Sequence, residues 1–239
     1  MRSVEEIGIM NYAIILAGGV GNRMNLKMPK QYLEVNKKPI IAYTLEKFED
    51  CELIDKIIIV SSDEWNEYLY DIIDKYHISK FASTTKNGLT RQLSILNGLK
   101  MIKECGAKEE DIVIIHDSVR PLVSDQLIKM CIIGCGDADG VLPAIKVKDT
   151  VYKTDGEKIV ELLNRDLIVS GQSPEAFVFG KYYDANIKSS EDDLKKINGS
   201  SEIAFNAGLK IKIIPGDENN FKITTIGDLE LFEKKVRIQ

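Results

Sequence analysis

Residues 12–24 of the chain read YAIILAGGVGNRM, and residues 29–31 read PKQ. The first six positions are almost continuously apolar, which is typical of a β-strand buried on both faces of a sheet. The glycines that follow allow the backbone to approach a phosphate and to turn its N–H groups toward it. In open α/β sheets, ligands bind outside the carboxyl ends of the strands, where this loop must lie. The stretch therefore predicts both a fold class and the place of a phosphate-binding site.

Similar apolar runs recur along the chain, and helical patterns separate them. The predicted strands are residues 12–17, 56–61, 111–116, 140–144 and 210–215. The predicted helices are residues 39–48, 64–76, 90–104, 124–133 and 226–236. Asp63 is the expected N-cap of the second helix, and Gly106 is expected to close the third. This alternation indicates an α/β fold with a doubly wound, mainly parallel sheet.

Residues 145–175 interrupt the alternation. Two strand patterns, residues 149–154 and 158–163, flank Asp155-Gly156, a hairpin turn signal. We therefore predict an inserted β-arm within one domain that spans residues 11–239. Residues 1–10 are expected to form a mobile N-terminal extension, and the polar residues 189–201 a surface helix and loop.

Composition excludes several classes of protein. The net charge of −5 argues against a nucleic-acid partner bound through a general basic surface. No apolar run approaches the roughly 20 residues of a membrane span, and the N-terminus lacks a signal-peptide pattern. The four cysteines form neither a CxxC pair nor a zinc pattern with histidine. We expect reduced thiols, a cytoplasmic protein and no membrane partner.

The glycine loop carries two cations, Arg23 and Lys30, within seven positions. It is not a Walker A loop, because no Gly-Lys-Ser/Thr closes it, and it does not fit GxGxxG. A plain turn with solvated Arg and Lys is the alternative interpretation. The combination of glycines, cations and strand-end position favours a phosphate site.

The pattern LAGGxGxRM followed by PKQ resembles the opening of the family of methylerythritol-phosphate and ribitol-phosphate cytidylyltransferases. Further matches follow in family order: HDSVRP at 116–121, KDT at 148–150, NR at 164–165, GQSP at 171–174 and FKITT at 221–225. Each match alone is weak, but the ordered set is specific and covers nearly the whole chain. The resemblance implies a nucleotide-diphospho-sugar transferase-like fold. It also implies an enzyme that transfers CMP from CTP to a polyol phosphate and releases pyrophosphate.

The resemblance also implies site residues. Arg23 and Lys30 would stabilise the transition state, while Arg165 and Lys222 would position the acceptor phosphate. The implied CTP site consists of Leu16, Ala17, Gly18, Gly19, Gly88, Leu89, Thr90, Arg91, Gln92, Leu93, Ser94, Asp117 and Ser118. The implied acceptor-binding residues are Arg120, Thr150 and Gln172.

The reaction itself explains why cations dominate this set. The nucleophile would be a phosphate oxygen that is already ionised at pH 7, so no general base is required. Positioned cations and backbone N–H groups must instead neutralise the growing negative charge. We expect Mg²⁺ as cofactor, held mostly by phosphates, with Asp117 as its protein ligand or as a ribose contact. The alternative for Asp117 is a cap or a salt bridge with Arg120, and that for residues 88–94 a helix start at Thr90.

The arm predicts a second subunit, because an isolated two-stranded hairpin is marginally stable in water. Packing against the same arm of another copy would bury its apolar side chains Val147, Val151, Ile159 and Leu163. We therefore expect a homodimer. By resemblance, Arg165 would reach the neighbouring active site. The alternative is an Arg165 salt bridge to Asp166 or Glu161 within one chain.

Several features bear on the acceptor. Ser118-Val119, residues 222–225 and the Trp65 helix favour the ribitol-phosphate branch, hence D-ribitol 5-phosphate as acceptor for teichoic acid or capsule synthesis. Methylerythritol phosphate, for isoprenoid synthesis, is the alternative, and a non-catalytic nucleotide-binding regulator is a third. One departure concerns the substrate side: Ser200-Ser201-Glu202 stands where the family usually shows Thr-Asp before a short helix.

Overall fold

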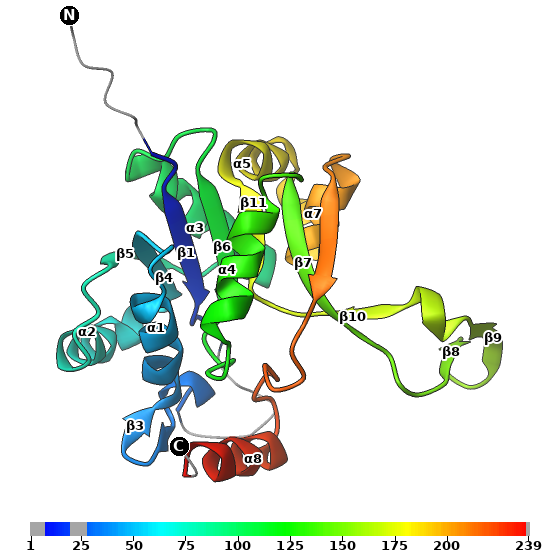
Figure 1. Ribbon diagram of the computed structural model, residues 1–239, viewed down its shortest axis with the longest axis horizontal. Helices are drawn as coiled ribbons and strands as arrows, with labels where there is room; N and C mark the ends of the chain where they lie inside the picture. The colour runs from blue at the N-terminus through cyan, green and yellow to red at the C-terminus, as the bar shows by residue number, and fades with distance from the viewer. Residues whose placement is uncertain (1–7, 20–27, 238–239) are drawn as a thin grey trace, which may run out of the picture.

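The computed structural model describes residues 8–19 and 28–237 of the chain. Its centre is an eight-stranded sheet (Figure 1) with the strand order β10-β7-β11-β6-β1-β4-β5, and β12 also pairs with β7. These strands are β1 (Asn11–Leu16), β4 (Lys56–Ser61), β5 (Phe81–Lys86), β6 (Ile112–Asp117), β7 (Gly140–Lys146), β10 (Val169–Gly171), β11 (Glu175–Val178) and β12 (Ile211–Pro215).

The sheet is mainly parallel, as the sequence predicts. β1 pairs in parallel with β4 and β6, β4 with β5, and β7 with β12. The antiparallel pairs involve β11, which lies between β6 and β7, and β10. The predictions missed β5, β10 and β11. β5 is a half-buried edge strand with the sequence FASTTK, so it lacks the apolar run by which the central strands are recognised.

Helices cover both faces of the sheet. They are α1 (Ile40–Asp50), α2 (Asn66–Lys75), α3 (Arg91–Glu104), α4 (Asp125–Gly134), α5 (Phe179–Lys188), α6 (Glu191–Lys196), α7 (Ser200–Asn206) and α8 (Ile226–Val236). Alternate residues of β1 face the two sides of the sheet: Ile15 belongs to the core cluster that includes residues of α1, α2 and α4, and Ile14 to the one that includes residues of α3, α5 and α7. Figure 1 shows helices on both faces. The doubly wound prediction is therefore confirmed.

Two local predictions need correction. Asp63 does not cap the second helix; residues 63–65 form a 3-10 turn, η3, and α2 begins at Asn66 after the N-cap Trp65. The carboxylate of Asp63 instead lies 2.6 Å from the Lys86 ammonium. The predicted N-terminal extension overlaps the fold at Met10, whose backbone N–H donates to Asp111.

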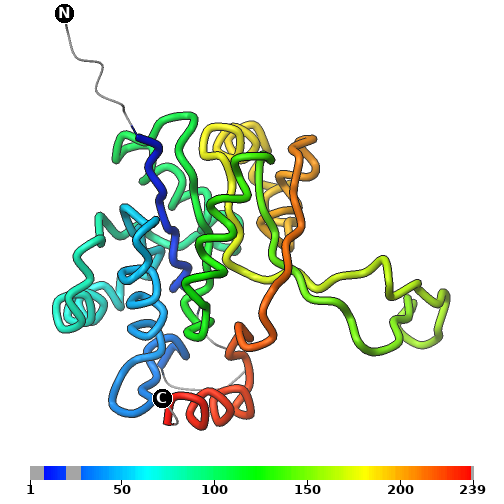
Figure 2. The backbone as a smooth tube through the Cα atoms, viewed as in Figure 1, coloured from blue at the N-terminus to red at the C-terminus, as the bar shows by residue number. Residues whose placement is uncertain are grey.

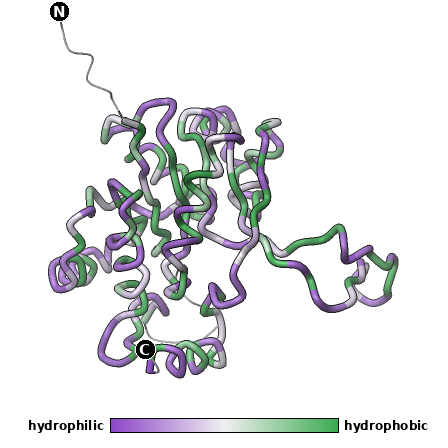
Figure 3. The backbone as a smooth tube through the Cα atoms, viewed as in Figure 1, coloured by the Kyte–Doolittle hydropathy of each residue, from purple (hydrophilic) through white to green (hydrophobic). Residues whose placement is uncertain are grey.

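The inserted arm is present. β8 (Val151–Thr154) and β9 (Ile159–Leu163) form a separate antiparallel hairpin that projects from the sheet (Figures 1 and 2). Gly156 has φ +106, the left-handed conformation that the Asp-Gly turn signal requires. Large apolar side chains of the arm are exposed, and Figure 3 shows hydrophobic segments along it. They are Tyr152, Ile159, Val160, Leu162 and Leu167.

Two further features agree with the composition. Within residues 8–19 and 28–237, no helix combines the length and the apolar character that crossing a bilayer requires. The four cysteines are free thiols. Burial raises the pKa of Cys51 to about 11 and that of Cys135 to about 12, so both stay protonated and unreactive.

The last helix docks against the first third of the chain. Phe232 of α8 is fully buried in a cluster with Val35, Ile40 and Ile223, and its ring meets Tyr43 edge-on at 5.1 Å. A capping box between Thr225 and Asp228 sets the start of α8. The docked helix therefore fixes the position of residues 221–225, which immediately precede it.

We expect Phe232→Ala to lower the free energy of unfolding by about 3–5 kcal/mol, because it removes a fully buried ring and leaves a cavity. Urea unfolding measures this change. Leu231→Ala is the matched control, since Leu231 on the same helix is 45% exposed. Equal losses in the two variants would mean that Phe232 does not anchor α8.

Candidate functional site

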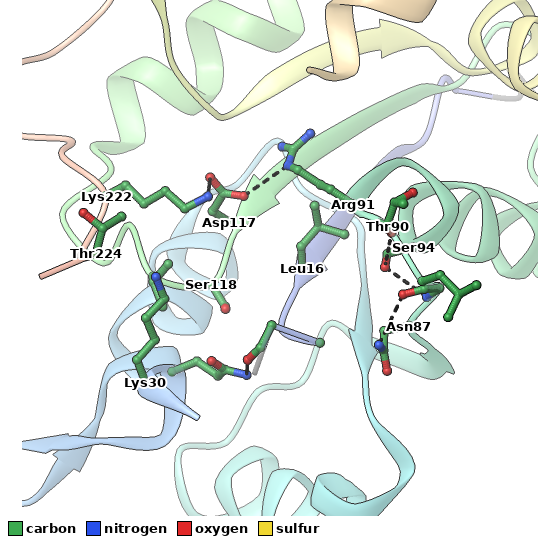
Figure 4. A pocket seen from close by; sticks show the side chains of 16 residues that line it. Leu16, Lys30, Asn87, Thr90, Arg91, Ser94, Asp117, Ser118, Lys222 and Thr224 are labelled. Carbon is green, nitrogen blue, oxygen red and sulfur yellow. Dashed lines mark hydrogen bonds and ion pairs between the residues drawn. The ribbon is translucent and has the colours of Figure 1, made fainter. Parts of the chain in front are cut away.

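The main pocket lies at the carboxyl ends of β1 and β6 and has a volume of about 570 Å³ (Figure 4). This is within the size range of small-molecule sites. Within residues 8–19 and 28–237, five segments line it: Leu16 with Gly18 and Gly19, Lys30-Gln31, residues 87–91 with Ser94, residues 117–119, and Lys222 with Thr224. The strand-end position is the one that the sequence predicts.

The glycine segment is held in place by Gln31. Its side-chain amide donates to the carbonyl oxygens of Ala17 and of Gly19, the latter at 3.0 Å. A Cβ atom on Gly18 would lie 2.3 Å from the Cβ of Asn87, so only glycine allows these two loops to meet. Arg23, predicted as a catalytic residue, lies outside the residues that the structure describes.

The loop of residues 87–91, between β5 and α3, is held by hydrogen bonds of the Ser94 and Thr90 hydroxyl groups. Ser94 Oγ accepts from the Gly88 N–H at 3.0 Å and donates to the Thr90 carbonyl at 2.9 Å. Thr90 also caps α3, so the helix-start interpretation and the pocket interpretation both hold for this residue. A Cβ atom on Gly88 would lie 2.4 Å from the Cβ of Leu93. This crowding keeps the loop tight against the first turn of α3.

Three residues of the implied CTP site do not line the pocket. Gln92 is buried and donates to Asn186 on α5 at 2.6 Å, so its side chain is bonded within the protein. Leu93 packs against the hydrophobic cluster beneath α3. Ala17 is also buried, and it contributes its carbonyl to Gln31. These three residues pack beneath the residues that line the pocket.

Asp117 is the centre of charge in the pocket. Its Oδ1 lies 3.4 Å from Arg91 Nε, and its Oδ2 lies 3.1 Å from Lys222 Nζ and 3.4 Å from Arg120 Nε. Burial alone would raise the pKa of Asp117, but the charges of Arg91, Lys222 and Arg120 outweigh it and hold this pKa well below its ordinary value. Asp117 is therefore ionised at neutral pH. It lines the pocket and forms the salt bridge with Arg120 at the same time.

Two lysines reach the pocket from opposite parts of the chain. Lys30 belongs to the 3-10 turn η2 (Lys30–Tyr32), and its ammonium donates to the Ile223 carbonyl at 2.8 Å. Lys222 lies just before α8, and the Ile223 N–H donates to the Val119 carbonyl at 3.0 Å. The side chains of Lys30 and Lys222 face the same space in Figure 4. Their charges can act on one polyanionic ligand.

His116 does not act as a base in this pocket. It is fully buried, and burial lowers its pKa to about 3. Its Nε2 lies 3.1 Å from the Arg120 carbonyl, which can only accept, so Nε2 carries the proton. Its Nδ1 accepts from the Ser173 hydroxyl at 3.4 Å. With both nitrogens bonded within the protein, the neutral ring links the turn after β6 to residues 172–174.

The implied acceptor-binding residues fall in two places. Arg120 donates to the Asn220 carbonyl at 2.7 Å, and Gln172 exchanges two hydrogen bonds with the backbone of Asp217, at 2.9 and 3.0 Å. Neither lines the main pocket; both hold the segment that leads to Lys222. In this structure they therefore hold the pocket wall in position.

Thr150 and Arg165 lie together on the arm. They line a second cavity of about 400 Å³, which the arm alone forms. The guanidinium of Arg165 donates to the Lys148 carbonyl at 2.8 Å, while Glu161 pairs with Lys153. Among the described residues, Arg165 forms neither of the two predicted alternatives, a salt bridge to Asp166 or one to Glu161. This cavity and the pocket around Asp117 share no lining residue, and the arm projects from the sheet (Figure 1).

The residues present fit a Mg²⁺ ion whose ligands are mostly phosphate oxygens. Within residues 8–19 and 28–237, no cluster of three or more His, Cys, Asp or Glu side chains could hold a metal ion by itself. Asp117 supplies one ionised carboxylate at the pocket wall, and Mg²⁺ in phosphate sites commonly has only one or two protein carboxylates.

The site residues implied by the resemblance leave out several that line the pocket or hold it, namely Gln31, Asn87, Val119, Thr224, Glu175 and Ser200. Of these, Val119, Thr224 and Ser200 lie in stretches of the sequence that bear on the acceptor. Asn87 and Val119 directly adjoin predicted positions, so neighbourhood in the chain could have suggested them. Glu175 and Ser200 contact Arg91 only in the folded chain.

Comparisons with known proteins agree on a cytidylyltransferase and divide between two acceptors. Residues 11–237 match the family model of 2-C-methyl-D-erythritol 4-phosphate cytidylyltransferase. The chain is 31% identical over 227 residues to a ribitol-5-phosphate cytidylyltransferase of Streptococcus agalactiae serotype V, covering 94% of each chain. It is 36% identical over 230 residues to a 2-C-methyl-D-erythritol 4-phosphate cytidylyltransferase of Clostridium botulinum, covering 94% of this chain and 96% of that one. The crystal structure of a 4-diphosphocytidyl-2C-methyl-D-erythritol synthase from Anaerococcus prevotii has a TM-score of 0.81 at 30% identity, with 96% of each chain covered.

The buried neutral His116 predicts a pH dependence of stability. Its pKa is about 3 in the folded chain, against about 6.5 when unfolded, so between these values only the unfolded state binds the proton. The contribution of neutral His116 to the free energy of unfolding is therefore fully present well above pH 6.5, and it is lost as the pH falls toward 3. We expect a loss of about 2 kcal/mol in the free energy of unfolding between pH 7 and pH 5.

Urea unfolding at several pH values measures this slope. His116→Gln should flatten it, whatever the variant's absolute stability. His77→Asn is the control, because it removes the other histidine and Asn tolerates the positive φ of 53 at that position. An unchanged slope in His116→Gln would mean that His116 keeps an ordinary pKa.

Proposed function

We propose an acceptor for this enzyme from the premise that the chain belongs to the 2-C-methyl-D-erythritol 4-phosphate cytidylyltransferase family. The protein is thus a CTP-dependent cytidylyltransferase, a nucleotidyltransferase that acts on a sugar-alcohol phosphate. Its proposed acceptor is D-ribitol 5-phosphate, and its products are CDP-ribitol and pyrophosphate. The product would serve teichoic acid or capsule synthesis in the cytoplasm.

The observation that supports this acceptor is the pocket wall beside Asp117. Ser118 and Val119, the pair that resembles the ribitol-phosphate branch, both line the pocket. Lys222 and Thr224, from the second segment with that resemblance, line it too. The alternative acceptor is 2-C-methyl-D-erythritol 4-phosphate, which relatives of similar identity are named for.

The chemistry follows from the charges. A phosphate oxygen of the acceptor attacks the α-phosphorus of CTP, a new P–O bond forms, and the bond to the β-phosphate oxygen breaks as pyrophosphate leaves. No proton transfer is needed, which agrees with a neutral, internally bonded His116. Lys30, with Arg23, stabilises the negative charge that grows in the transition state. Lys222 holds the acceptor phosphate near the point of attack.

In this proposal the cytidine end of the pocket lies where two loops meet. Gly18, Asn87, Gly88 and Ser94 bring two loops into close contact there. A base edge that pairs with fixed polar groups is discriminated from analogues that leave those groups unpaired. At the other end, Asp117 together with phosphate oxygens would hold Mg²⁺, whose charge neutralises the triphosphate when bound.

The arm supports a homodimer. Its large apolar side chains Tyr152, Ile159 and Leu162 are 50–65% exposed, and packing against the same arm of a second copy would cover them. Arg165 and Thr150 share the arm's cavity, away from their own chain's pocket. In the dimer, Arg165 reaches the pocket of the other subunit and there contacts the acceptor phosphate.

A pyrophosphate-release assay tests the function. We expect turnover with CTP and D-ribitol 5-phosphate, with kcat/KM at least about 10-fold above that with 2-C-methyl-D-erythritol 4-phosphate or with UTP. Faster turnover of methylerythritol phosphate would establish the alternative acceptor, and equal use of UTP would refute the cytidine assignment. CTP binding without pyrophosphate release for any acceptor would indicate a regulator instead.

Mixed dimers test the placement of Arg165. Inactive Arg165→Ala and inactive Lys30→Ala chains are refolded together, so that one of the two sites in each hybrid has both residues intact. Activity should recover toward about half of the wild-type value per hybrid. Each variant refolded alone is the control. Hybrids that are present but inactive would place Arg165 in its own subunit's site or outside catalysis.

A further inference from the structure

We propose that Glu175 is a positioning residue of the active site: from β11 it fixes Arg91 and, through Arg91, the carboxylate of Asp117. The proposal rests on the cytidylyltransferase activity and adds a residue that contacts neither substrate. It also assigns a role to the point where the sequence departs from the family pattern.

Glu175 is a buried acid next to the pocket. It begins β11 and pairs in register with Ile115, two residues before Asp117 on β6. Its side chain is only 8% exposed. One carboxylate oxygen lies 3.8 Å from Arg91 Nη2, and the other accepts from both the N–H and the hydroxyl of Ser201, the N–H at 2.9 Å. A buried carboxylate requires such partners, and here they are Arg91 and the start of α7.

Arg91 is anchored on three sides. Its Nε faces Asp117 Oδ1 at 3.4 Å, its Nη1 lies 2.5 Å from Ser200 Oγ, and its Nη2 faces Glu175. Because the guanidinium is a planar group with its donors at fixed angles, three anchors leave it one orientation. Arg91 lines the pocket and Glu175 does not. Glu175 therefore acts on the pocket only through Arg91.

The charge of Glu175 also determines how strongly Arg91 pairs with Asp117, because both carboxylates attract the same guanidinium. Asp117 has three cationic neighbours, and Glu175 draws part of the Arg91 charge away from it. Without Glu175, Arg91 would pair with Asp117 alone. Asp117 would then be less available to orient Lys222 and a phosphate-bound cation. We therefore expect loss of Glu175 to affect turnover more than nucleotide binding.

Ser200 and Ser201 complete this network. The Ser200 carbonyl accepts from Tyr182 at 3.0 Å, and Tyr182 in turn accepts from Gln92, the neighbour of Arg91. Where the family usually has an acid, Ser201 supplies two hydrogen-bond donors, its N–H and its hydroxyl, and the carboxylate that accepts them belongs to Glu175. Because the Ser201 hydroxyl touches the Glu175 carboxylate, an acid at position 201 would occupy nearly the same place. Moving the carboxylate from position 175 to position 201, with an uncharged donor at 175, should therefore preserve the arrangement around Arg91.

The exchange is tested with E175Q, S201D and the double variant E175Q/S201D. Pyrophosphate release with the best acceptor gives kcat and KM, and calorimetry gives the Kd for CTP. In E175Q we expect kcat to fall about 10-fold, as for other groups that orient site residues. We expect the Kd to rise about threefold. S201D should also lose activity, because two adjacent carboxylates then repel each other. The double variant should return to within about threefold of wild type on both measures.

Glu202→Gln is the matched control. Glu202 lies on the same first turn of α7 but accepts from the Asn198 N–H, so its loss should change neither kcat nor Kd. Thermal melts check that each variant is folded. If E175Q does not fold, the double variant is the deciding test. We expect it to fold, because an acid in the first turn of a helix is favourable.

Two results would overturn the role of Glu175: wild-type kcat and Kd in E175Q, or a folded double variant no better than E175Q. A wild-type protein that releases no pyrophosphate would refute the cytidylyltransferase chemistry instead. The CTP affinities of the same variants would then still decide whether Glu175 positions Arg91.

Discussion

A single buried carboxylate, that of Asp117, holds together parts of the chain that are distant in sequence. Arg91 comes from the start of α3, Arg120 from the turn after β6, and Lys222 from the segment before α8. Three cations this close would repel one another without a shared anion. The low exposure of Asp117 strengthens each attraction, since charges interact more strongly away from water. The pocket walls therefore depend on a charge that the sheet itself positions, at the end of its central strand β6.

Much of this fold is legible in the sequence, because burial on both faces makes central strands almost purely apolar. β1, β4 and β6 were predicted to within a residue at each end, and α8 was predicted with its observed bounds. β5 and β11 were not, because an edge strand tolerates polar residues and β11 has only four residues. The hairpin arm was recognisable from its Asp-Gly turn.

The candidate site could be predicted only in part. The strand-end position of the pocket and the residues Lys30, Asp117 and Lys222 follow from the sequence, and all three line the pocket. A motif does not say what each residue contacts: Arg91 and Gln92 are neighbours, yet Arg91 lines the pocket and pairs with Asp117, while Gln92 is buried and bonds to Asn186. Gln172 and Arg120 likewise bond to backbone near the pocket. No sequence pattern specifies such packing.

The contact between Lys30 and the carbonyl of Ile223 joins residues 193 positions apart. During synthesis, the amino-terminal strands leave the ribosome long before Ile223 exists. The sheet around β1, β4 and β6 can form early, but the wall that carries Lys222 closes only after α8 has emerged and docked on residues 35–43. A nascent chain therefore completes its nucleotide pocket last. A chain that stops before α8 would lack the helix that fixes the wall carrying Lys222.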